Sequence, residues 1–244
     1  MNPARGTLRG FPDPAALAQA GAEFLCERAE SSTGPFVVAL SGGSTPKPLY
    51  QLLALEPFRA RLPWDRIHWV LGDERFVKWS DPASNFGMIC GAFLSHVPAP
   101  SANIHPVPTE DVTLEEAAQR YEDMLKELYG AETLSADRPL LSVNFLGLGE
   151  DGHTASLLPG QPALQERERW VVPVSHGRAE PRITLTYRAL ESTRYTVFLV
   201  TGAKKAAILD KVLSGDTETP AGRLHPAGEL VWFADQEAAG GWAK

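Results

Sequence analysis

Residues 35–46 read Pro-Phe-Val-Val-Ala-Leu-Ser-Gly-Gly-Ser-Thr-Pro, and this stretch decides the class of fold. The apolar run 36–40 is typical of a strand that is buried on both faces of a sheet. Residues 41–45 form a glycine-rich turn, and Pro46 starts a helical stretch that extends to about Leu55. A strand, a glycine turn and a helix in this order make up half of a βαβ unit, which predicts a parallel sheet.

The same alternation of strands and helices continues on both sides of this stretch. Asp13 is a predicted N-cap, with Pro14 in the first position of a helix over 15–29. Further strands are predicted at 67–71, 140–146, 195–201 and 230–233, and a half-exposed strand at 182–187. Further helices are predicted to begin near Ser84, after the capping box Thr113-Leu-Glu-Glu116, and after Gly202. We therefore expect one compact α/β domain over residues 1–244, with a mostly parallel central sheet covered on both faces and a small excursion around 160–190.

The composition fits a globular protein that acts on a small molecule. Apolar residues make up 43% and charged residues 22% of the 244 residues, so the chain can bury a core. The net charge of −7 argues against a general nucleic-acid binder, which normally presents a basic surface. No apolar run approaches the ~18 residues that span a bilayer, and no signal peptide is evident, so we expect a cytoplasmic protein. Cys26 and Cys90 are too few for a disulfide scaffold and fit a reducing compartment.

Two loops that follow predicted strands are candidate anion sites, because ligands of open α/β sheets bind outside the carboxyl ends of the strands. In the loop 41–46, small residues, the Ser44 and Thr45 hydroxyls and a helix start can bind a phosphate; a capped tight turn is the alternative. In the loop 72–75, Gly-Asp-Glu-Arg, the Arg75 guanidinium can grip a phosphate or carboxylate. A solvated turn with local ion pairs is the alternative, and the loop by itself favours it.

The segment 147–156, Gly-Leu-Gly-Glu-Asp-Gly-His-Thr-Ala-Ser, is the strongest candidate for catalysis. Its three glycines place His153 and two carboxylates on a backbone that can bend sharply, and histidine transfers protons near neutral pH. By default, we interpret the other five histidines as core or surface residues. The sequence contains no HExxH, CxxC or G-x-S-x-G motif, so we expect neither a zinc site nor a serine hydrolase.

Basic residues elsewhere in the chain lie at the start or just after the end of other predicted strands. Arg182 begins its strand, and Lys204 and Lys205 follow Gly202. If these segments end at the same edge of the sheet, they form with Arg75 the cation cluster that an acidic protein needs to bind an anion.

Five motifs, in this order and spacing, resemble those of the 6-phosphogluconolactonases. They are Ser-Gly-Gly-Ser-Thr-Pro (41–46), Gly-Asp-Glu-Arg (72–75) with Ser-Asn (84–85), Gly-Leu-Gly-Glu-Asp-Gly-His-Thr-Ala-Ser-Leu-Leu-Pro (147–159), Arg-Ile-Thr-Leu-Thr (182–186) and Thr-Gly-Ala-Lys-Lys-Ala-Ala (201–207). The resemblance covers about residues 10–236. It implies the Rossmann-like three-layer fold that glucosamine-6-phosphate deaminases, ribose-5-phosphate isomerases and CoA transferases share.

The resemblance also implies an activity, namely hydrolysis of 6-phosphoglucono-1,5-lactone to 6-phosphogluconate in the oxidative pentose phosphate pathway, with no metal or cofactor. It places His153 at the position of the catalytic base, with Asp151 and Arg75 in the same catalytic set. The residues that it places at the substrate and its phosphate are Gly42, Gly43, Ser44, Thr45, Asp73, Arg182 and Lys205. The expected partner is this small molecule, without nucleic acid or membrane; the oligomeric state stays open, and a monomer is compatible with the sequence.

Two alternatives remain. A deaminase or isomerase of the same superfamily would resemble this chain at several motifs, and Asp73 can serve as its base. Those deaminases, however, carry a glutamate where this chain has Leu158 and a tyrosine where it has Arg75, and both departures favour the lactonase. The second alternative is a sugar-phosphate sensor without turnover, but a sensor has no need of the His153 base.

Overall fold

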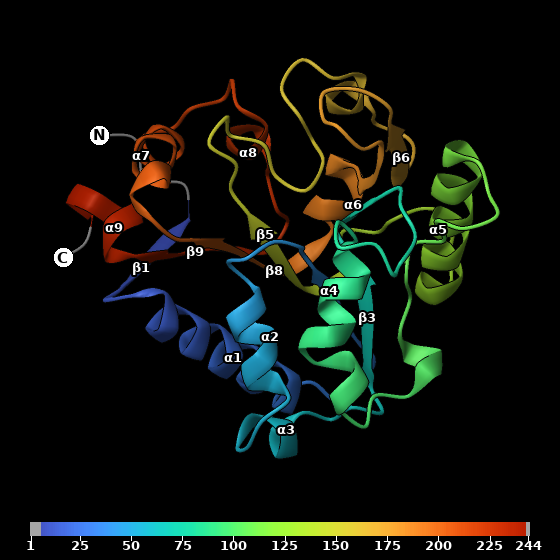
Figure 1. Cartoon of the computed structure of the whole chain (residues 1–244), viewed down its shortest axis with the longest axis horizontal. Helices are drawn as coiled ribbons and strands as arrows, with labels where there is room; N and C mark the ends of the chain where they lie inside the picture. The colour runs from blue at the N-terminus through green and yellow to red at the C-terminus, as the bar shows by residue number, and fades with distance from the viewer. Residues whose placement is uncertain (1–5, 243–244) are drawn as a thin grey trace.

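The computed structural model of the protein describes residues 6–242, and a parallel sheet runs through the centre of this part of the chain (Figure 1). Within these residues the sheet has six strands in the order β1-β9-β8-β5-β2-β3, and every neighbouring pair is parallel. The strands are β1 (Thr7–Phe11), β2 (Phe36–Leu40), β3 (Ile67–Leu71), β5 (Leu141–Gly147), β8 (Thr193–Val200) and β9 (Glu229–Asp235). The expected three-layer α/β fold with a mostly parallel central sheet is confirmed.

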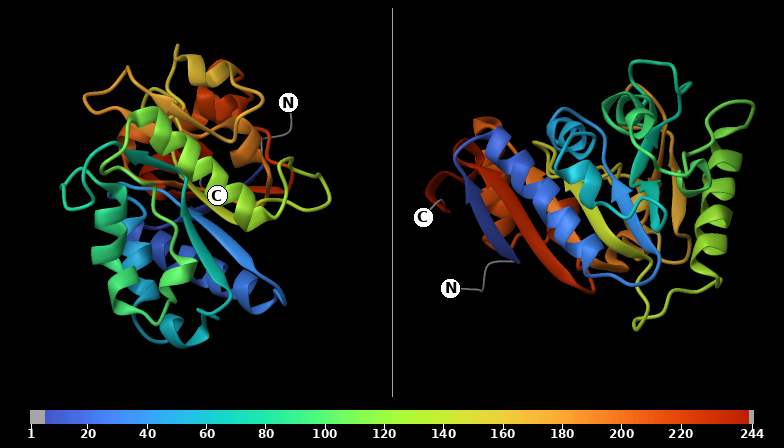
Figure 2. Two further views of the ribbon diagram at one scale, coloured as in Figure 1. Left: turned by 90° about the vertical axis from the view of Figure 1, so that its right-hand side faces the viewer. Right: turned by 90° about the horizontal axis from the view of Figure 1, so that it is seen from below.

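Helices cover both faces of the sheet, as Figures 1 and 2 show. One face carries α1 (Pro14–Glu30), α2 (Lys47–Leu53), α3 (Phe58–Arg61) and α4 (Asn85–Ala92). The other face carries α7 (Ala206–Leu213), α8 (Pro220–Arg223) and α9 (Gln236–Ala239), and beyond them α5 (Leu114–Tyr129) and α6 (Tyr187–Glu191). None of the helices within residues 6–242 combines the length and the apolar character that crossing a bilayer requires.

A second, antiparallel sheet is formed by β4 (Asp73–Arg75), β7 (Arg182–Leu185) and β6 (Val171–Val174), in that order. It is the excursion expected around 160–190, but the sequence did not predict β6, nor that β4 would join from the loop after β3. The expectation of a half-exposed strand at 182–187 is wrong: Thr184 and Thr186, which alternate with Ile183 and Leu185, are 1% and 0% exposed, so both faces of this segment are buried. Helix α5 packs on β6 and β7. The amide of Leu185 donates to Gly72 O at 2.9 Å, and this bond links the two sheets directly.

The local signals at helix starts act as predicted. Asp13 caps α1 by accepting a hydrogen bond from Ala16 N at 2.8 Å, and Pro14 is the first helical residue. The capping box of Thr113 and Glu116 is present at the start of α5. Residues 67–71 form β3 as expected.

Strand β1 was not predicted from the sequence. Its residues, Thr-Leu-Arg-Gly-Phe, form no apolar run and include a glycine, so they carry no local strand signal. The strand exists because all of its residues pair with residues 231–235 of β9, and the ring of Phe11 packs against that of Phe233 with 5.0 Å between the ring centres.

Two buried tyrosine hydroxyls fix the carboxyl ends of β2 and β3. Tyr50 Oη accepts from Ser41 N at 3.0 Å and donates to Ser41 O at 2.9 Å. Tyr121 Oη makes the same pair of bonds with Leu71, at 2.6 and 3.0 Å. Burial raises the pKa of both phenols, so both stay neutral and can donate and accept at once. The loops that follow these strands therefore start from fixed positions.

Candidate active site

A pocket of about 170 Å³ opens at the carboxyl edge of the central sheet, between this sheet and the antiparallel one. Loops after β2, β5 and β8 meet β4, β7 and the start of α4 there. Its lining residues are Ser41, Gly42, Asp73, Arg75, Asn85, Gly147, Leu148, Gly149, His153, Ala155, Arg182 and Lys205. The pocket thus collects residues from six separate segments of the chain, as expected for a ligand site of an open α/β sheet.

His153 sits in a loop whose turns depend on glycine. The amide of Gly149 donates to His153 O at 2.8 Å, and Gly152 N donates to Gly149 O at 2.9 Å. A Cβ atom on Gly149 would overlap the imidazole of His153. Gly152 has a φ of 78°, which other residues rarely adopt. The loop therefore holds the imidazole close against its own backbone, with 27% of the side chain exposed.

An ionised carboxylate orients the imidazole of His153. Asp151 Oδ1 lies 2.5 Å from His153 Nδ1, and its Oδ2 accepts from Arg178 Nη2 at 2.6 Å. Partial burial opposes ionisation of Asp151, but the bonds from Arg178 and His153 outweigh it and hold the pKa of this carboxyl well below its ordinary value. An ionised carboxylate only accepts hydrogen bonds, so the proton of this bond belongs to Nδ1, and in a neutral imidazole Nε2 is then the nitrogen with a free lone pair.

Arg178 belongs to the site but was not predicted from the sequence. Its Nη2 atom lies 3.1 Å from His153 Nδ1, at the carboxylate that bonds this ring. Residues 175–181 carry no motif, and a single arginine in an exposed loop gives no signal in the sequence. Arg178 and Asp151 are 27 residues apart, so only the packing of the two loops reveals the contact.

Arg182 lies in the pocket as a buried cation. Its side chain is 12% exposed, and Nη1 is 3.8 Å from Asp73 Oδ2. Its Nε atom is buried and has no hydrogen-bond partner among residues 6–242. Burial lowers the pKa of Arg182, and the charges of Arg75 and Arg178 lower it further, although Asp73 opposes them. A guanidinium that is crowded by like charges and has an unused donor is suited to bind an anion.

The loop 72–75 is not the solvated turn that its composition favours. Asp73 is 7% exposed and Glu74 is 0% exposed. Glu74 accepts hydrogen bonds from the amides of Arg75, Asn85 and Phe86, each at 2.7 Å. Burial raises the pKa of Glu74, while these amide bonds lower it. The carboxyl group ties β4 to the start of α4, and this fixes the position of Arg75.

Arg75 and Asn85 complete this side of the pocket. Arg75 Nη1 donates to Ala83 O at 2.5 Å, while its buried Nε has no partner in the described part of the chain. Asn85 Nδ2 donates to Asp73 O at 2.9 Å. The asparagine also limits the other wall, because a Cβ atom on Gly42 would overlap its side chain. The glycine at 42 is therefore required for the two walls to approach.

The rest of the glycine-rich loop is arranged differently from the expectation. Gly43, with a φ of 101°, and Ser44 are exposed and do not line the pocket. Thr45 Oγ1 lies 3.1 Å from Thr201 Oγ1, and it does not cap α2, which has no side-chain cap. The capped-turn alternative is therefore wrong, and the loop instead contacts the segment that follows β8.

Lys205 enters the pocket from the short 3₁₀ turn Ala203–Lys205, whereas Lys204 is exposed outside it. With Arg75 and Arg182 it gives the lining three cations, against one carboxylate, Asp73. The structure therefore brings the cations of three distant segments to one pocket, although Arg75 and Arg182 come from the antiparallel sheet and not from the edge of the central one. The excess positive charge suits an anionic ligand.

The remaining histidines and the cysteines lie elsewhere. His68 and His105 stack on each other, with 3.1 Å between Nδ1 and Nε2, and neither lines the pocket. Cys26 and Cys90 are free thiols in α1 and α4, and burial raises the pKa of each, to about 12 and about 11. Within the described residues, no three His, Cys, Asp or Glu side chains form a group that could hold a metal ion.

Comparison with known proteins extends over nearly the whole chain. Residues 12–232 match the family model described as glucosamine-6-phosphate isomerases/6-phosphogluconolactonase. A 6-phosphogluconolactonase of Synechocystis is 42% identical over 86% of this chain and 86% of its own length. The crystal structure of a 6-phosphogluconolactonase from Thermotoga maritima superposes with a TM-score of 0.81 at 29% identity, covering 94% of this chain and 99% of that one. A monomeric glucosamine-6-phosphate deaminase shares the fold, with a TM-score of 0.80 at 21% identity and coverage of 96% and 98%.

Proposed function

The chain belongs to the family of glucosamine-6-phosphate isomerases and 6-phosphogluconolactonases, and we propose that it hydrolyses 6-phosphoglucono-1,5-lactone to 6-phosphogluconate. The observation that carries this proposal is the imidazole of His153, bonded through Nδ1 to Asp151 in a pocket lined by three cations. A lactone is an activated ester. Its hydrolysis needs a base, an oriented water molecule and stabilisation of one negative charge.

In the proposed reaction, Nε2 of His153 takes a proton from water while the water oxygen bonds to C1 of the lactone. The negative charge passes to the carbonyl oxygen, where a neighbouring cation or backbone amide stabilises it. As the bond between C1 and the ring oxygen breaks, His153 returns its proton to that oxygen. The carboxyl product then ionises. The carboxylate of Asp151 is already ionised, and it stabilises the positive charge that forms on the imidazole when the ring takes up this proton.

Arg75, Arg182 and Lys205 are proposed to bind the phosphate and to anchor the sugar relative to His153. The unused Nε atoms of the two arginines support this role, since each can donate to a phosphate oxygen without losing a bond to the protein. Asp73 Oδ2 accepts a hydrogen bond from Ser156 Oγ at 2.5 Å and lies 3.8 Å from Arg182 Nη1. We assign it to positioning Arg182 and the substrate.

A deaminase or isomerase is less well supported by the site. The position where those deaminases carry a glutamate is Leu158, which is 2% exposed and part of the apolar core. This leaves His153 with Asp151 and without the carboxylate that opens an amino-sugar ring in those enzymes.

The test is to follow 6-phosphoglucono-1,5-lactone directly, with and without the protein, and to subtract the spontaneous opening of the lactone. We expect strong acceleration, and no release of ammonia from glucosamine 6-phosphate. A lactone decay equal to the spontaneous rate would overturn the proposal. Ammonia release would favour the deaminase instead.

A further inference from the structure

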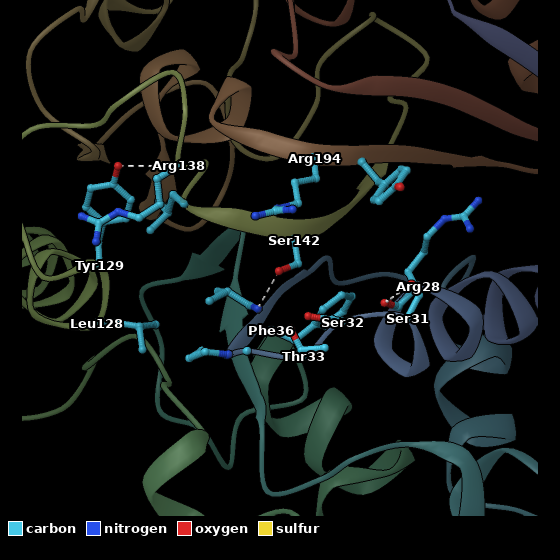
Figure 3. A pocket seen from close by; sticks show the side chains of 15 residues that line it. Arg28, Ser31, Ser32, Thr33, Phe36, Leu128, Tyr129, Arg138, Ser142 and Arg194 are labelled. Carbon is cyan, nitrogen blue, oxygen red and sulfur yellow. Dashed lines mark hydrogen bonds between the residues drawn. The ribbon is translucent and has the colours of Figure 1, made fainter.

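A second and larger pocket lies at the opposite, amino edge of the central sheet (Figure 3). Its volume is about 630 Å³, within the range of about 300–1,000 Å³ that is typical of small-molecule sites. It lies beneath the starts of β2, β5 and β8, the strands whose other ends carry the catalytic loops. The two pockets are therefore separated by the length of these strands.

Three arginines border this amino-edge pocket from different sides: Arg28 from the last turn of α1, Arg138 from the segment before β5, and Arg194 from β8 (Figure 3). None of the residues that line the pocket is an aspartate or a glutamate. Within residues 6–242, no carboxylate forms an ion pair with any of the three guanidinium groups. In a protein with a net charge of −7, an acid-free pocket with three arginines is a local reversal of the overall charge.

Aromatic rings, in place of carboxylates, hold two of these arginines. The guanidinium of Arg28 lies 4.8 Å from the centre of the Phe24 ring and 4.9 Å from that of Tyr195. That of Arg138 lies 4.1 Å from the ring of Tyr129. Stacking on a ring fixes the plane of a guanidinium but uses none of its N–H groups. The N–H donors are thus left for a ligand, and the buried Nε of Arg28 has no partner in the described residues.

Hydroxyl groups add further donors around the same cavity. Ser32 and Thr33 lie in the turn after α1 and Ser142 lies near the start of β5 (Figure 3), whereas the Ser31 hydroxyl already donates to Arg28 O at 3.0 Å. The α1 carbonyls of Glu27 and Ala29, which would repel an anion, already accept bonds from the amides of Ser31 and Ser32.

We propose that the amino-edge pocket binds a small molecule that carries two or more phosphate groups. Phosphate groups match both the bidentate guanidinium forks and the hydroxyl donors. The arginines come from separate sides of a cavity too large for a single phosphate ion, so a ligand with several anionic groups can satisfy them together. The proposal does not depend on the reaction at the other edge.

The test is calorimetric titration of the whole protein at about 0.15 M ionic strength with three probes: tripolyphosphate, ADP and citrate. We expect saturable binding of tripolyphosphate or ADP. Tighter binding of tripolyphosphate would identify an inorganic ligand, and tighter binding of ADP would identify an organic phosphate. No saturable binding of either, or equal binding of citrate, would overturn the proposal.

Variants of the arginines test where the phosphate probe binds. The double variant Arg138→Gln/Arg194→Gln changes two exposed side chains, and we expect binding to weaken by at least about tenfold, since charge-assisted bonds are lost. Arg120→Gln removes an exposed charge from α5 outside the pocket and is expected to change nothing. If the double variant does not fold, Arg194→Gln is tested alone, because this side chain makes no hydrogen bond in the described structure. We expect the single variant to weaken binding of the probe as well.

Arg182→Gln in the catalytic pocket separates the two sites. Unchanged binding of the probe in this variant supports the amino-edge pocket. Loss of binding in Arg182→Gln, together with full binding in the Arg138/Arg194 double variant, would place the anion at the catalytic edge and overturn the proposal.

Discussion

The two edges of the central sheet both gather cations, but they hold them by different interactions. At the carboxyl edge, Arg178 pairs with Asp151 at 2.6 Å and Arg182 lies 3.8 Å from Asp73. At the amino edge, Arg28 and Arg138 stack on aromatic rings and pair with no carboxylate of the described residues. A carboxylate therefore fixes the direction of Arg178 at the carboxyl edge, whereas stacking leaves the N–H groups of Arg28 and Arg138 without a carboxylate partner at the amino edge.

This difference indicates which function each edge of the sheet is suited to. Charge-assisted hydrogen bonds fix both the distance and the direction of a side chain, which a reaction at a defined carbon requires. Stacking leaves hydrogen-bonding capacity unused, which suits binding without chemistry. Substitutions at the carboxyl edge should therefore change kcat or KM in distinct ways, while those at the amino edge should not alter the chemical step.

The largest effect is expected for His153→Ala. Loss of the general base should lower kcat by about 10²–10⁴-fold, while the affinity for 6-phosphogluconate, measured by calorimetry, changes little. His96→Ala is the matched control, because His96 is exposed and does not line the catalytic pocket. Full activity of His153→Ala would remove the functional distinction between the edges.

A smaller effect, on KM, is expected for Arg182→Gln. If its guanidinium binds the phosphate, KM for the phosphorylated lactone should rise by about ten- to a hundredfold, with a smaller change in kcat. The preference over unphosphorylated gluconolactone should fall by a similar factor. Arg194→Gln, the same loss of charge at the amino edge, is expected to leave this preference in place. An equal loss of preference in both variants would contradict the comparison.

Gly149→Ala tests whether the loop backbone places the imidazole. The added Cβ overlaps His153, so the ring must move, and we expect kcat to fall by about tenfold or more with little change in KM. Gly91→Ala in α4 adds the same methyl group where nothing lies within reach, and serves as the control for any general effect of the substitution. A kcat equal in both variants would show that the ring position is not set by this contact.

The smallest effect at neutral pH is expected for Arg178→Gln, and it should grow in acid. Arg178 helps to hold the pKa of Asp151 below its usual value of about 3.9, so its loss lets that pKa rise. As the pH falls toward about 4, Asp151 begins to protonate in the variant while it remains ionised in the parent protein. The ratio of parent to variant kcat should therefore increase from pH ~6 to pH ~4. A ratio independent of pH would rule out this role of Arg178.

Much of the fold follows from short stretches of sequence. The apolar run of β2, the N-cap Asp13 and the capping box at Thr113 each depend on residues within one or two turns of the chain, and each occurs as predicted. The edge strand β1 and the short β4 carry no such local pattern. They form only because β9 and β7 offer them backbone hydrogen bonds.

The candidate site divides in the same way. Motifs place His153 in the loop after a strand of the parallel sheet, whose carboxyl edge is the expected place for a ligand. Arg75 and Arg182 meet for a different reason, because they are paired residues of β4 and β7 in the antiparallel sheet, which the sequence did not predict. The burial of Glu74 could not be predicted, because its charged neighbours suggest a solvated turn, and it is the start of α4 that supplies its amide donors. Residues without a motif, such as Arg178, gave no signal.

The sequence by itself determined the alternation of strands and helices, the glycine turns and the histidine loop, because these depend on interactions between near neighbours in the chain. Only the tertiary structure decided which distant side chains meet. The contact of Arg178 with Asp151 and the acid-free pocket at the amino edge arise from segments that are far apart in sequence. The positions of these segments depend on how the layers pack, and no local pattern of residues specifies which distant segments will come into contact.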